Sequence, residues 1–155
     1  MKINIEVGID PGLGGAIVAL CEGQPVEWMA MPTMKAGASS RVNGAELAAF
    51  IRSCNASHVF VEQVGAMPGQ GVTSMFTFGH AAGVVAGVVA AIDLPLTLVT
   101  PQAWKKRAGL TGTEKDAARA RAIQLYPGWR DLGTKVRGQA LADAALIARF
   151  GGGAA

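Results

Sequence analysis

Residues 72–92 form a run of 21 residues without a formal charge, which is long enough to cross a bilayer. Three of its properties argue against a membrane span. The run contains His80 and many weakly apolar glycines and alanines, it has no tryptophan or tyrosine at its ends, and it separates two strand-like segments that would lose their partner. We therefore interpret the run as a buried helix of a globular domain and expect no membrane partner.

The segments before this helix show strand and helix patterns. Residues 3–9, 16–21 and 25–31 predict three successive strands joined by short turns, and residues 32–42 predict a loop. Asn43 and Glu46 form a capping-box pattern at the start of an amphipathic helix. A fourth strand is predicted over residues 58–62 and a fifth, after the uncharged run, over residues 96–100.

Helical patterns dominate the last third of the chain. Pro101 begins a predicted helical turn that extends to residue 106. Thr113 is expected to cap a helix that has Asp116 at its N3 position and ends near Tyr126, and a last helix is predicted over residues 139–150 after a loop over residues 128–138. This order predicts an α/β fold with a five-stranded mixed sheet flanked by helices, in a single domain over residues 1–155.

Composition is that of an ordinary globular protein. Half of the residues are apolar and 16% are charged, which argues against an intrinsically disordered chain. The N-terminus carries no signal-peptide pattern, and the two cysteines, Cys21 and Cys54, lie in apolar segments. Buried thiols in a domain of this size are typical of a reducing compartment, so we expect a cytoplasmic protein.

The net charge of +3 is unevenly distributed. Residues 1–100 contain four basic and seven acidic side chains, whereas residues 101–155 contain ten basic and four acidic ones, so the two parts have net charges of −3 and +6. A one-sided excess of lysine and arginine is typical of proteins that bind a phosphate backbone. The same excess also fits a solvated helical face, and charge alone does not decide between the two interpretations.

Three acidic residues stand in apolar surroundings. Asp10 follows the first predicted strand, Glu62 ends the fourth, and Asp143 lies in the last predicted helix. If those two strands are neighbours, their acids meet at one end of the sheet, where the last helix can add Asp143. Three half-buried carboxylates repel one another unless a cation binds, and Mg²⁺ prefers such oxygen ligands. Taken singly, Asp10 could serve a turn and Glu62 could reach solvent, but an unpaired charge in the apolar helix would be costly.

The same three acids stand in motifs that resemble a known family. Residues 8–12 (Gly-Ile-Asp-Pro-Gly), 61–64 (Val-Glu-Gln-Val) and 142–148 (Ala-Asp-Ala-Ala-Leu-Ile-Ala) resemble the acidic motifs of the RuvC Holliday-junction resolvases, in the same order. Residues 67–79, and residues 99–105 with Thr-Pro-Gln-Ala-Trp-Lys, resemble RuvC-related proteins of phages and prophages. The resemblance extends over nearly the whole chain.

This resemblance implies an RNase H-like fold and a homodimeric, structure-selective endodeoxyribonuclease that cleaves Holliday junctions or other branched DNA, in a bacterium or a phage-infected host cell. It assigns the binding of divalent ions, expected to be two Mg²⁺ or Mn²⁺, to Asp10, Glu62 and Asp143. It also places Lys105 and Lys115 near the scissile phosphate, with Lys115 as a further catalytic residue. The expected DNA contacts are Lys105, Lys106, Arg107, Lys115, Arg119, Met67 and Gln70.

Two positions depart from the pattern of the family. The family usually has a fourth acid, or a histidine, one turn before the last aspartate, whereas this turn contains Gly138, Gln139 and Ala140. Gln139 could still accept a metal-bound water, and Asp131 could reach the site from the preceding loop. The alternative function is therefore a protein that binds branched DNA with weak or no cleavage. The family's aromatic residue three positions after the second acid is replaced by Gly65, which favours a broader specificity for branched DNA.

Two further features leave alternatives open. Gly79, Gly83 and Gly87 form a smooth stripe that could face the sheet or a second copy of the chain. The resemblance places this helix at the dimer interface, so we favour the second copy. The opening Gly-x-Asp-x-Gly pattern also occurs in phosphotransfer domains of the actin and sugar-kinase type, but 155 residues are too few for the two lobes of such folds.

Overall fold

A mixed five-stranded sheet forms the centre of the computed structural model, which describes residues 2–112, 114 and 116–153. The strand order is β3-β2-β1-β6-β7. The strands are β1 (Ile5–Ile9), β2 (Ala16–Cys21), β3 (Gln24–Ala30), β6 (His58–Glu62) and β7 (Leu96–Val99). β1 pairs antiparallel with β2 and parallel with β6, and β6 pairs parallel with β7. The predicted mixed sheet with flanking helices is therefore confirmed.

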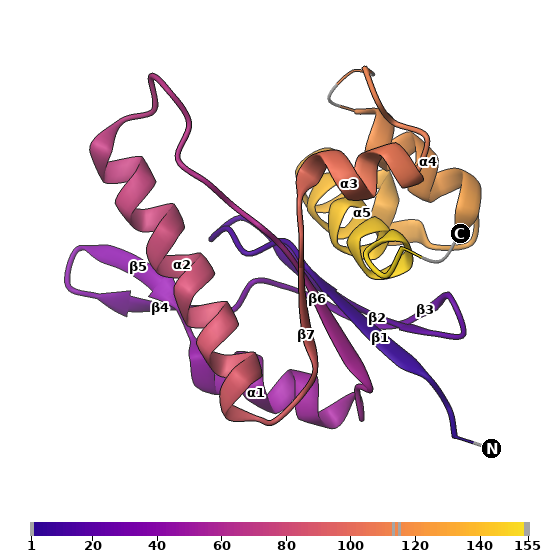
Figure 1. Cartoon of the computed structure of the whole chain (residues 1–155), viewed down its shortest axis with the longest axis horizontal. Coiled ribbons are helices and arrows are strands. Elements are labelled where there is room, and N and C mark those ends of the chain that lie inside the picture. Colours follow the sequence, from indigo (N-terminus) through magenta and orange to yellow (C-terminus); the bar gives the residue numbers. More distant parts are fainter. Residues whose placement is uncertain (1, 113, 115, 154–155) are drawn as a thin grey trace.

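Helices cover both faces of this sheet (Figure 1). The first face carries α1 (Gly44–Ser53) and α2 (Val72–Ala91). The second face carries α3 (Pro101–Arg107), α4 (Ala117–Leu125), the 3-10 turn η1 (Arg130–Gly133) and α5 (Lys135–Phe150). Alternation along the strands explains the division, because successive side chains point to opposite faces. Val59 and Val61 pack towards α1 and α2, while Phe60 between them packs against the second set of helices.

Two helices begin where the sequence predicts. Asn43 Oδ1 accepts a hydrogen bond from Glu46 N at 3.2 Å and so caps α1. Thr100 Oγ1 accepts a hydrogen bond from Ala103 N at 3.2 Å, and Pro101 follows as the first residue of α3. These local signals need no distant contact, which explains why the sequence alone reveals them.

The segment predicted as a loop, residues 32–42, instead forms a β-hairpin. Its strands, β4 (Thr33–Ala36) and β5 (Ser39–Val42), pair antiparallel and form a separate two-stranded sheet. Gly37 adopts a φ of +64° in the turn. The hairpin is mostly exposed, so its sequence lacks the apolar alternation that identifies a half-buried strand.

Two boundaries in the last third also differ from prediction. α4 begins at Ala117, so Asp116 is its N-cap residue rather than its N3 residue, and Thr113 lies outside the described residues. α5 begins at Lys135, four residues earlier than predicted, and η1 occupies part of the predicted loop. The first three residues of α5, 135–137, are exposed, and a helix there is stabilised by the packing of its later, buried turns.

α2 is less buried than predicted. Its buried residues are Ala81, Val85 and Val89, which form one stripe against α1 and the sheet. In the part of the chain that the structure describes, α2 is the one helix long and apolar enough to cross a membrane, and 17% of its most apolar window is buried. The glycine stripe faces away from the sheet, because Gly79, Gly83 and Gly87 are exposed and have open space around them. The sheet-facing alternative is therefore wrong.

Candidate active site

Asp10 and Glu62 meet at the carboxyl end of two paired strands. β1 and β6 pair in parallel with Ile9 opposite Val61, so the next residue of each strand, Asp10 and Glu62, are neighbours. Because side chains alternate along a strand, both carboxyls point to the face that Gly8 shares, which α5 covers. The predicted pairing of the first and fourth strands is confirmed.

Gly8 allows α5 to lie directly on β1. A Cβ atom at residue 8 would overlap the backbone oxygen of Ala144 and the backbone nitrogen of Ala148. The position therefore accepts no side chain larger than hydrogen while α5 keeps its place. Asp143 immediately precedes Ala144, so this close approach also brings the third carboxyl towards the end of β1. The charge of Asp10 raises the pKa of Asp143.

Burial favours the protonated form of all three carboxyls. Desolvation is the main cause that raises the pKa of Asp10, Glu62 and Asp143 above their usual values. The pKa of Asp143 rises to about 7, because the negative charges of Asp10 and Glu62 add to the effect of burial. Lys105 acts in the opposite direction and lowers the pKa of each of the three. Such surroundings favour a bound cation, which would replace the protons.

Each carboxyl accepts a hydrogen bond on one oxygen, and the donors come from three different parts of the chain. Gly12 N donates to Asp10 Oδ1 at 3.5 Å, Trp104 Nε1 to Glu62 Oε2 at 2.6 Å, and Gln139 Nε2 to Asp143 Oδ1 at 3.0 Å. The hydrogen bonds from the side chains of Trp104 and Gln139 fix the orientations of the Glu62 and Asp143 carboxyls, respectively. The first bond is long and leaves Asp10 the least constrained of the three.

Gln139 occupies the turn of α5 before Asp143. Its amide nitrogen holds Asp143, and its carbonyl oxygen Oε1 is buried and finds no donor within the described residues. A buried carbonyl oxygen without a donor is costly, and oxygen is the ligand that hard divalent cations prefer. The carboxyls of Asp10, Glu62 and Asp143 and the carbonyl oxygen of Gln139 are therefore the types of ligand that a divalent cation would bind. As the side chains stand, no group of three His, Cys, Asp or Glu residues among those described is arranged to hold a metal ion.

Asp131 does not reach the site as the structure stands. Trp28 Nε1 donates to Asp131 Oδ2 at 2.7 Å, and Arg137 Nη2 lies 3.6 Å from the same oxygen. Both partners hold Asp131 in η1. Asp131 therefore does not supply the missing acid in this structure. The side chain that contacts Asp143 is that of Gln139, which donates a hydrogen bond to it.

The predicted basic contacts divide into two groups. Lys105 and Lys106 are exposed on α3, and Lys105 is close enough to the three carboxyls to affect their pKa values. Arg107 donates through Nη1 to the backbone oxygens of residues 150 and 151, and Arg119 donates to Leu132 O at 3.2 Å. These arginines fasten elements together in addition to adding charge. Lys115 lies outside the described residues.

A neutral groove of about 380 Å³ lies beside the turn that follows Asp10. Its lining is formed by Leu13, Gln70, Thr73, Ser74, Thr77 and Phe78. These lining residues carry no charge, in contrast to the lysines of α3. Met67, in the loop before α2, is 67% exposed. Figure 1 shows the loop between β6 and α2 on the other side of the molecule from α3, so the two predicted contacts of this loop, Met67 and Gln70, lie away from the basic residues of α3.

Two positions of the site escape interpretation from sequence patterns. Nothing local indicates that Trp104 donates to Glu62, because the two residues are 42 positions apart. The need for Gly8 also depends on a helix that begins 127 residues later, at Lys135. The available signals are the placement of Gly8 two residues before Asp10 and of Trp104 beside Lys105.

The fold is similar to solved structures of RuvC. The structure of T. thermophilus RuvC in complex with a Holliday junction substrate matches with a TM-score of 0.66 at 18% identity, over 94% of this chain and 90% of that chain. A second structure of Thermus thermophilus RuvC matches with a TM-score of 0.58 at 17% identity, over 93% of this chain and 90% of that chain. No protein-family model and no curated protein matches the sequence. The likeness shows a RuvC-type, RNase H-like fold.

Proposed function

Because the fold is that of RuvC, we propose that this chain is a divalent-metal-dependent, structure-selective endodeoxyribonuclease that cleaves Holliday junctions or other branched DNA. The observation that supports the proposal is that Asp10 and Glu62 follow one another at the ends of two paired strands, and that the charges of both raise the pKa of Asp143 in α5. The structure of RuvC with a Holliday junction substrate makes branched DNA the first substrate to test. The protein would act in the cytoplasm of a bacterium or a phage-infected host cell.

The carboxyls of Asp10, Glu62 and Asp143, with the carbonyl oxygen of Gln139, would hold the divalent ions, expected to be two Mg²⁺ or Mn²⁺. Such ions supply an activated water and stabilise the oxygens of an in-line phosphodiester displacement. Hydrolysis adds the water oxygen to phosphorus and breaks one ester bond of the strand. The protein's own contribution is to hold the carboxyls ionised and oriented, and Lys105 assists by lowering the pKa of all three.

DNA would lie across the carboxyls, between the basic and the neutral side of the site. Lys105 and Lys106 present exposed ammonium groups for phosphate oxygens, and Lys115 is proposed to act with them near the scissile phosphate. Arg107 and Arg119 would add positive charge from positions fixed by their carbonyl partners. Met67 and Gln70 would contact the strand from the neutral side. Binding of this kind weakens steeply as salt rises.

We expect the wild-type protein to nick four-way junctions in Mg²⁺ or Mn²⁺ and to be inactive in EDTA. Asp10→Asn should lower the rate about 1000-fold, because removal of one ligand charge forfeits several kcal/mol of metal-dependent stabilisation. The measurement is a gel assay of strand cleavage on four-way, three-way and linear DNA, at equal protein concentration. Equal rates for wild-type protein and Asp10→Asn would show that the site has been wrongly assigned.

The alternative function, binding of branched DNA with weak or no cleavage, is favoured by one observation: an uncharged Gln139 stands beside Asp143. An amide oxygen holds a cation less strongly than a carboxylate does. Tight, salt-sensitive binding of junctions by the wild-type protein, without nicking in either metal, would select this alternative. Gain of cleavage in Gln139→Glu would then identify the uncharged position as the cause.

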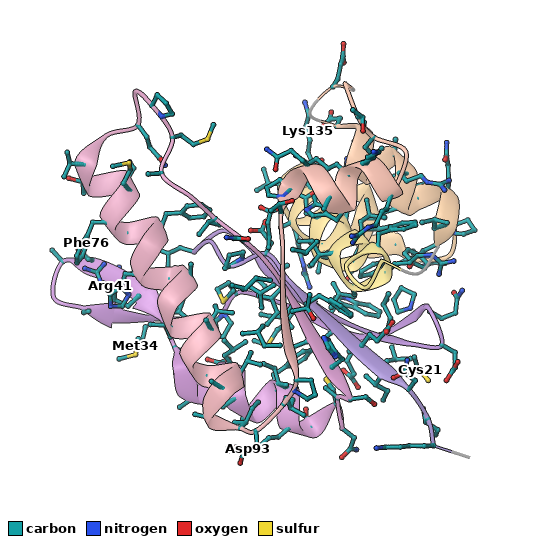
Figure 2. The ribbon with its side chains drawn as sticks, viewed as in Figure 1. Cys21, Met34, Arg41, Phe76, Asp93 and Lys135 are labelled. Carbon is teal, nitrogen blue, oxygen red and sulfur yellow. The ribbon has the colours of Figure 1, made fainter. Side chains whose placement is uncertain are left out.

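We propose further that the protein is a homodimer through the outer face of α2. Val72 and Phe76 are 81% and 64% exposed on this helix, and the exposed Gly79, Gly83 and Gly87 continue the helix without bulky side chains. Figure 2 shows Phe76 on the outer side of α2, beside Arg41 of β5, whose guanidinium lies 5.9 Å from the ring centroid. Exposed apolar side chains on one helix face are typical of interaction surfaces, and small residues allow two helices to approach closely.

Gly83→Glu is expected to convert the dimer to a monomer without unfolding it. Gly83 has open space around it in the single chain, so a longer side chain disturbs only a partner. Light scattering should give the mass of a dimer for the wild-type protein and of a monomer for the variant. Ala49→Glu makes the same charge change at an exposed position of α1 and should stay dimeric. A monomeric wild-type protein, or a dimeric Gly83→Glu, would rule out this interface.

A further inference from the structure

Trp104 connects α3 to the end of β6. Its side chain is 1% exposed and packs with Phe60, Val99 and Leu146 in the layer beneath α3. The one polar atom of this buried ring, Nε1, donates a hydrogen bond of 2.6 Å to Glu62 Oε2. A buried indole N–H generally finds an acceptor, and here the acceptor is one of the three carboxyls of the site. Packing and hydrogen bonding therefore act through the same side chain.

The backbone around this contact fixes the position of the indole. Gln63 N donates to Val99 O at 2.7 Å, so the chain leaves β6 and β7 at the same level. Thr100 then caps α3, and Trp104 follows in the first turns of that helix. A side chain carried by a capped helix and buried on all sides has few rotamers, so the direction of its N–H is set before any ligand binds.

The Trp104 ring also lies beside the ammonium group of Lys105. Lys105 Nζ is 5.4 Å from the centroid of the Trp104 ring, within the range of a cation–π contact. The hydrogen bond to Glu62 Oε2 leaves the second oxygen, Oε1, without that constraint. The edge of the Trp104 indole thus binds the carboxylate of Glu62, and its face attracts the ammonium group of Lys105. The indole thereby fixes the position of this negative charge relative to this positive charge.

We propose that Trp104 is a positioning residue of the metal site, which holds Glu62 in the orientation that binds a divalent cation. The inference rests on the proposed metal dependence of the site and adds a residue that would contact neither metal nor DNA. Hydrogen-bond partners of metal-binding carboxylates commonly contribute 10- to 100-fold to metal affinity. An effect of about that size is expected when the N–H of Trp104 is removed.

The test is Trp104→Phe, which keeps an aromatic ring in the core and removes the donor. Trp28→Phe is the matched control, because Trp28 Nε1 also donates to a carboxylate, Asp131 Oδ2, at 2.7 Å. Calorimetric titration with Mn²⁺, without DNA, should show affinity about 10- to 100-fold lower in Trp104→Phe and unchanged in Trp28→Phe. Raised Mn²⁺ should restore cleavage by Trp104→Phe, because only occupancy of the site is impaired.

A measurement on the unaltered chain guards against a variant that does not fold. The protein has three tryptophans, and their ¹⁵N-labelled indole N–H signals can be assigned by elimination with Trp28→Phe and Trp129→Phe. Titration with Mg²⁺ should shift the Trp104 signal and leave the Trp28 signal in place. An unmoved Trp104 signal in a protein that binds Mg²⁺, or equal Mn²⁺ affinity in folded Trp104→Phe, would overturn the inference. Absence of metal binding in the wild-type protein would instead overturn the proposed metal dependence.

Discussion

Gly8→Ala is expected to lower the free energy of unfolding by about 3 kcal/mol, which is the upper range for overpacking a core. The added methyl group would overlap backbone atoms of Ala144 and Ala148, which cannot rotate away as a flexible side chain could. Either β1 or α5 has to shift. Because Asp143 directly precedes Ala144, a shift of α5 also moves the third carboxyl, and affinity for divalent cations should fall together with stability.

The measurement is chemical denaturation of the metal-free protein, followed by titration of the folded variant with Mn²⁺. Gly14→Ala is the matched control, since Gly14 is an exposed glycine of the turn after Asp10 and no heavy atom lies within 4 Å of the place that an added methyl group would occupy. This control should retain both stability and metal binding. If Gly8→Ala unfolds like the wild-type protein, the close packing of α5 on β1 is wrong.

Asp143→Asn is expected to stabilise the metal-free protein at pH 8 and to abolish tight metal binding. Burial and the charges of Asp10 and Glu62 raise the pKa of Asp143 from 3.8 to about 7 in the folded chain. One pKa unit corresponds to about 1.4 kcal/mol, so the ionised group could cost the fold up to roughly 4 kcal/mol. Asparagine has no such charge, and its side-chain oxygen can still accept the hydrogen bond from Gln139.

The sign of the pH dependence follows from the proton count. Between about pH 4 and pH 7 the folded chain retains a proton on Asp143 that the unfolded chain has lost, so the folded state binds more protons. Stability therefore decreases as the pH rises through this window and levels off above it. The raised pKa values of Asp10 and Glu62 act in the same direction.

Denaturation in EDTA at pH 5, 6, 7 and 8 measures this slope. Asp143→Asn should show a shallower slope than the wild-type protein, and Mg²⁺ should stabilise only the wild-type protein at pH 8. Asp93→Asn is the control, because Asp93 lies in the exposed turn after α2, at the lower edge of the molecule in Figure 2. A wild-type slope that is unchanged in Asp143→Asn would contradict the assignment of the raised pKa to this residue.

The parts of the fold that the sequence predicts are those with local signals. The strand that precedes Asp10 alternates apolar residues with others, and the strand that ends at Glu62 is a short apolar run. Asn43 and Thr100 cap the helices that come after them. The meeting of Asp10 and Glu62 also follows from a simple rule, since parallel neighbours present the same end of each strand. These features require knowledge of a few residues at a time.

The remaining features depend on contacts between distant residues. The β4–β5 hairpin is exposed, so no apolar pattern reveals it, and α2 packs by one narrow stripe although most of its residues are apolar and none is charged. The partners of Asp131 and Glu62 are tryptophans 103 and 42 positions away. A sequence pattern shows that Trp28 and Trp104 are apolar and large, but not which acceptor each N–H reaches.

The close packing of α5 on Gly8 has a consequence for the synthesis of the protein. A ribosome releases Asp10 and Glu62 well before α5, so a nascent chain that stops ahead of Lys135 has two of the three carboxyls and an uncovered apolar face that includes Val18 and Phe60. The third carboxyl arrives only with the helix that covers this face. During translation, the core and the site are therefore completed together, when α5 has been synthesised. A polypeptide that lacks α5 has no assembled cation site.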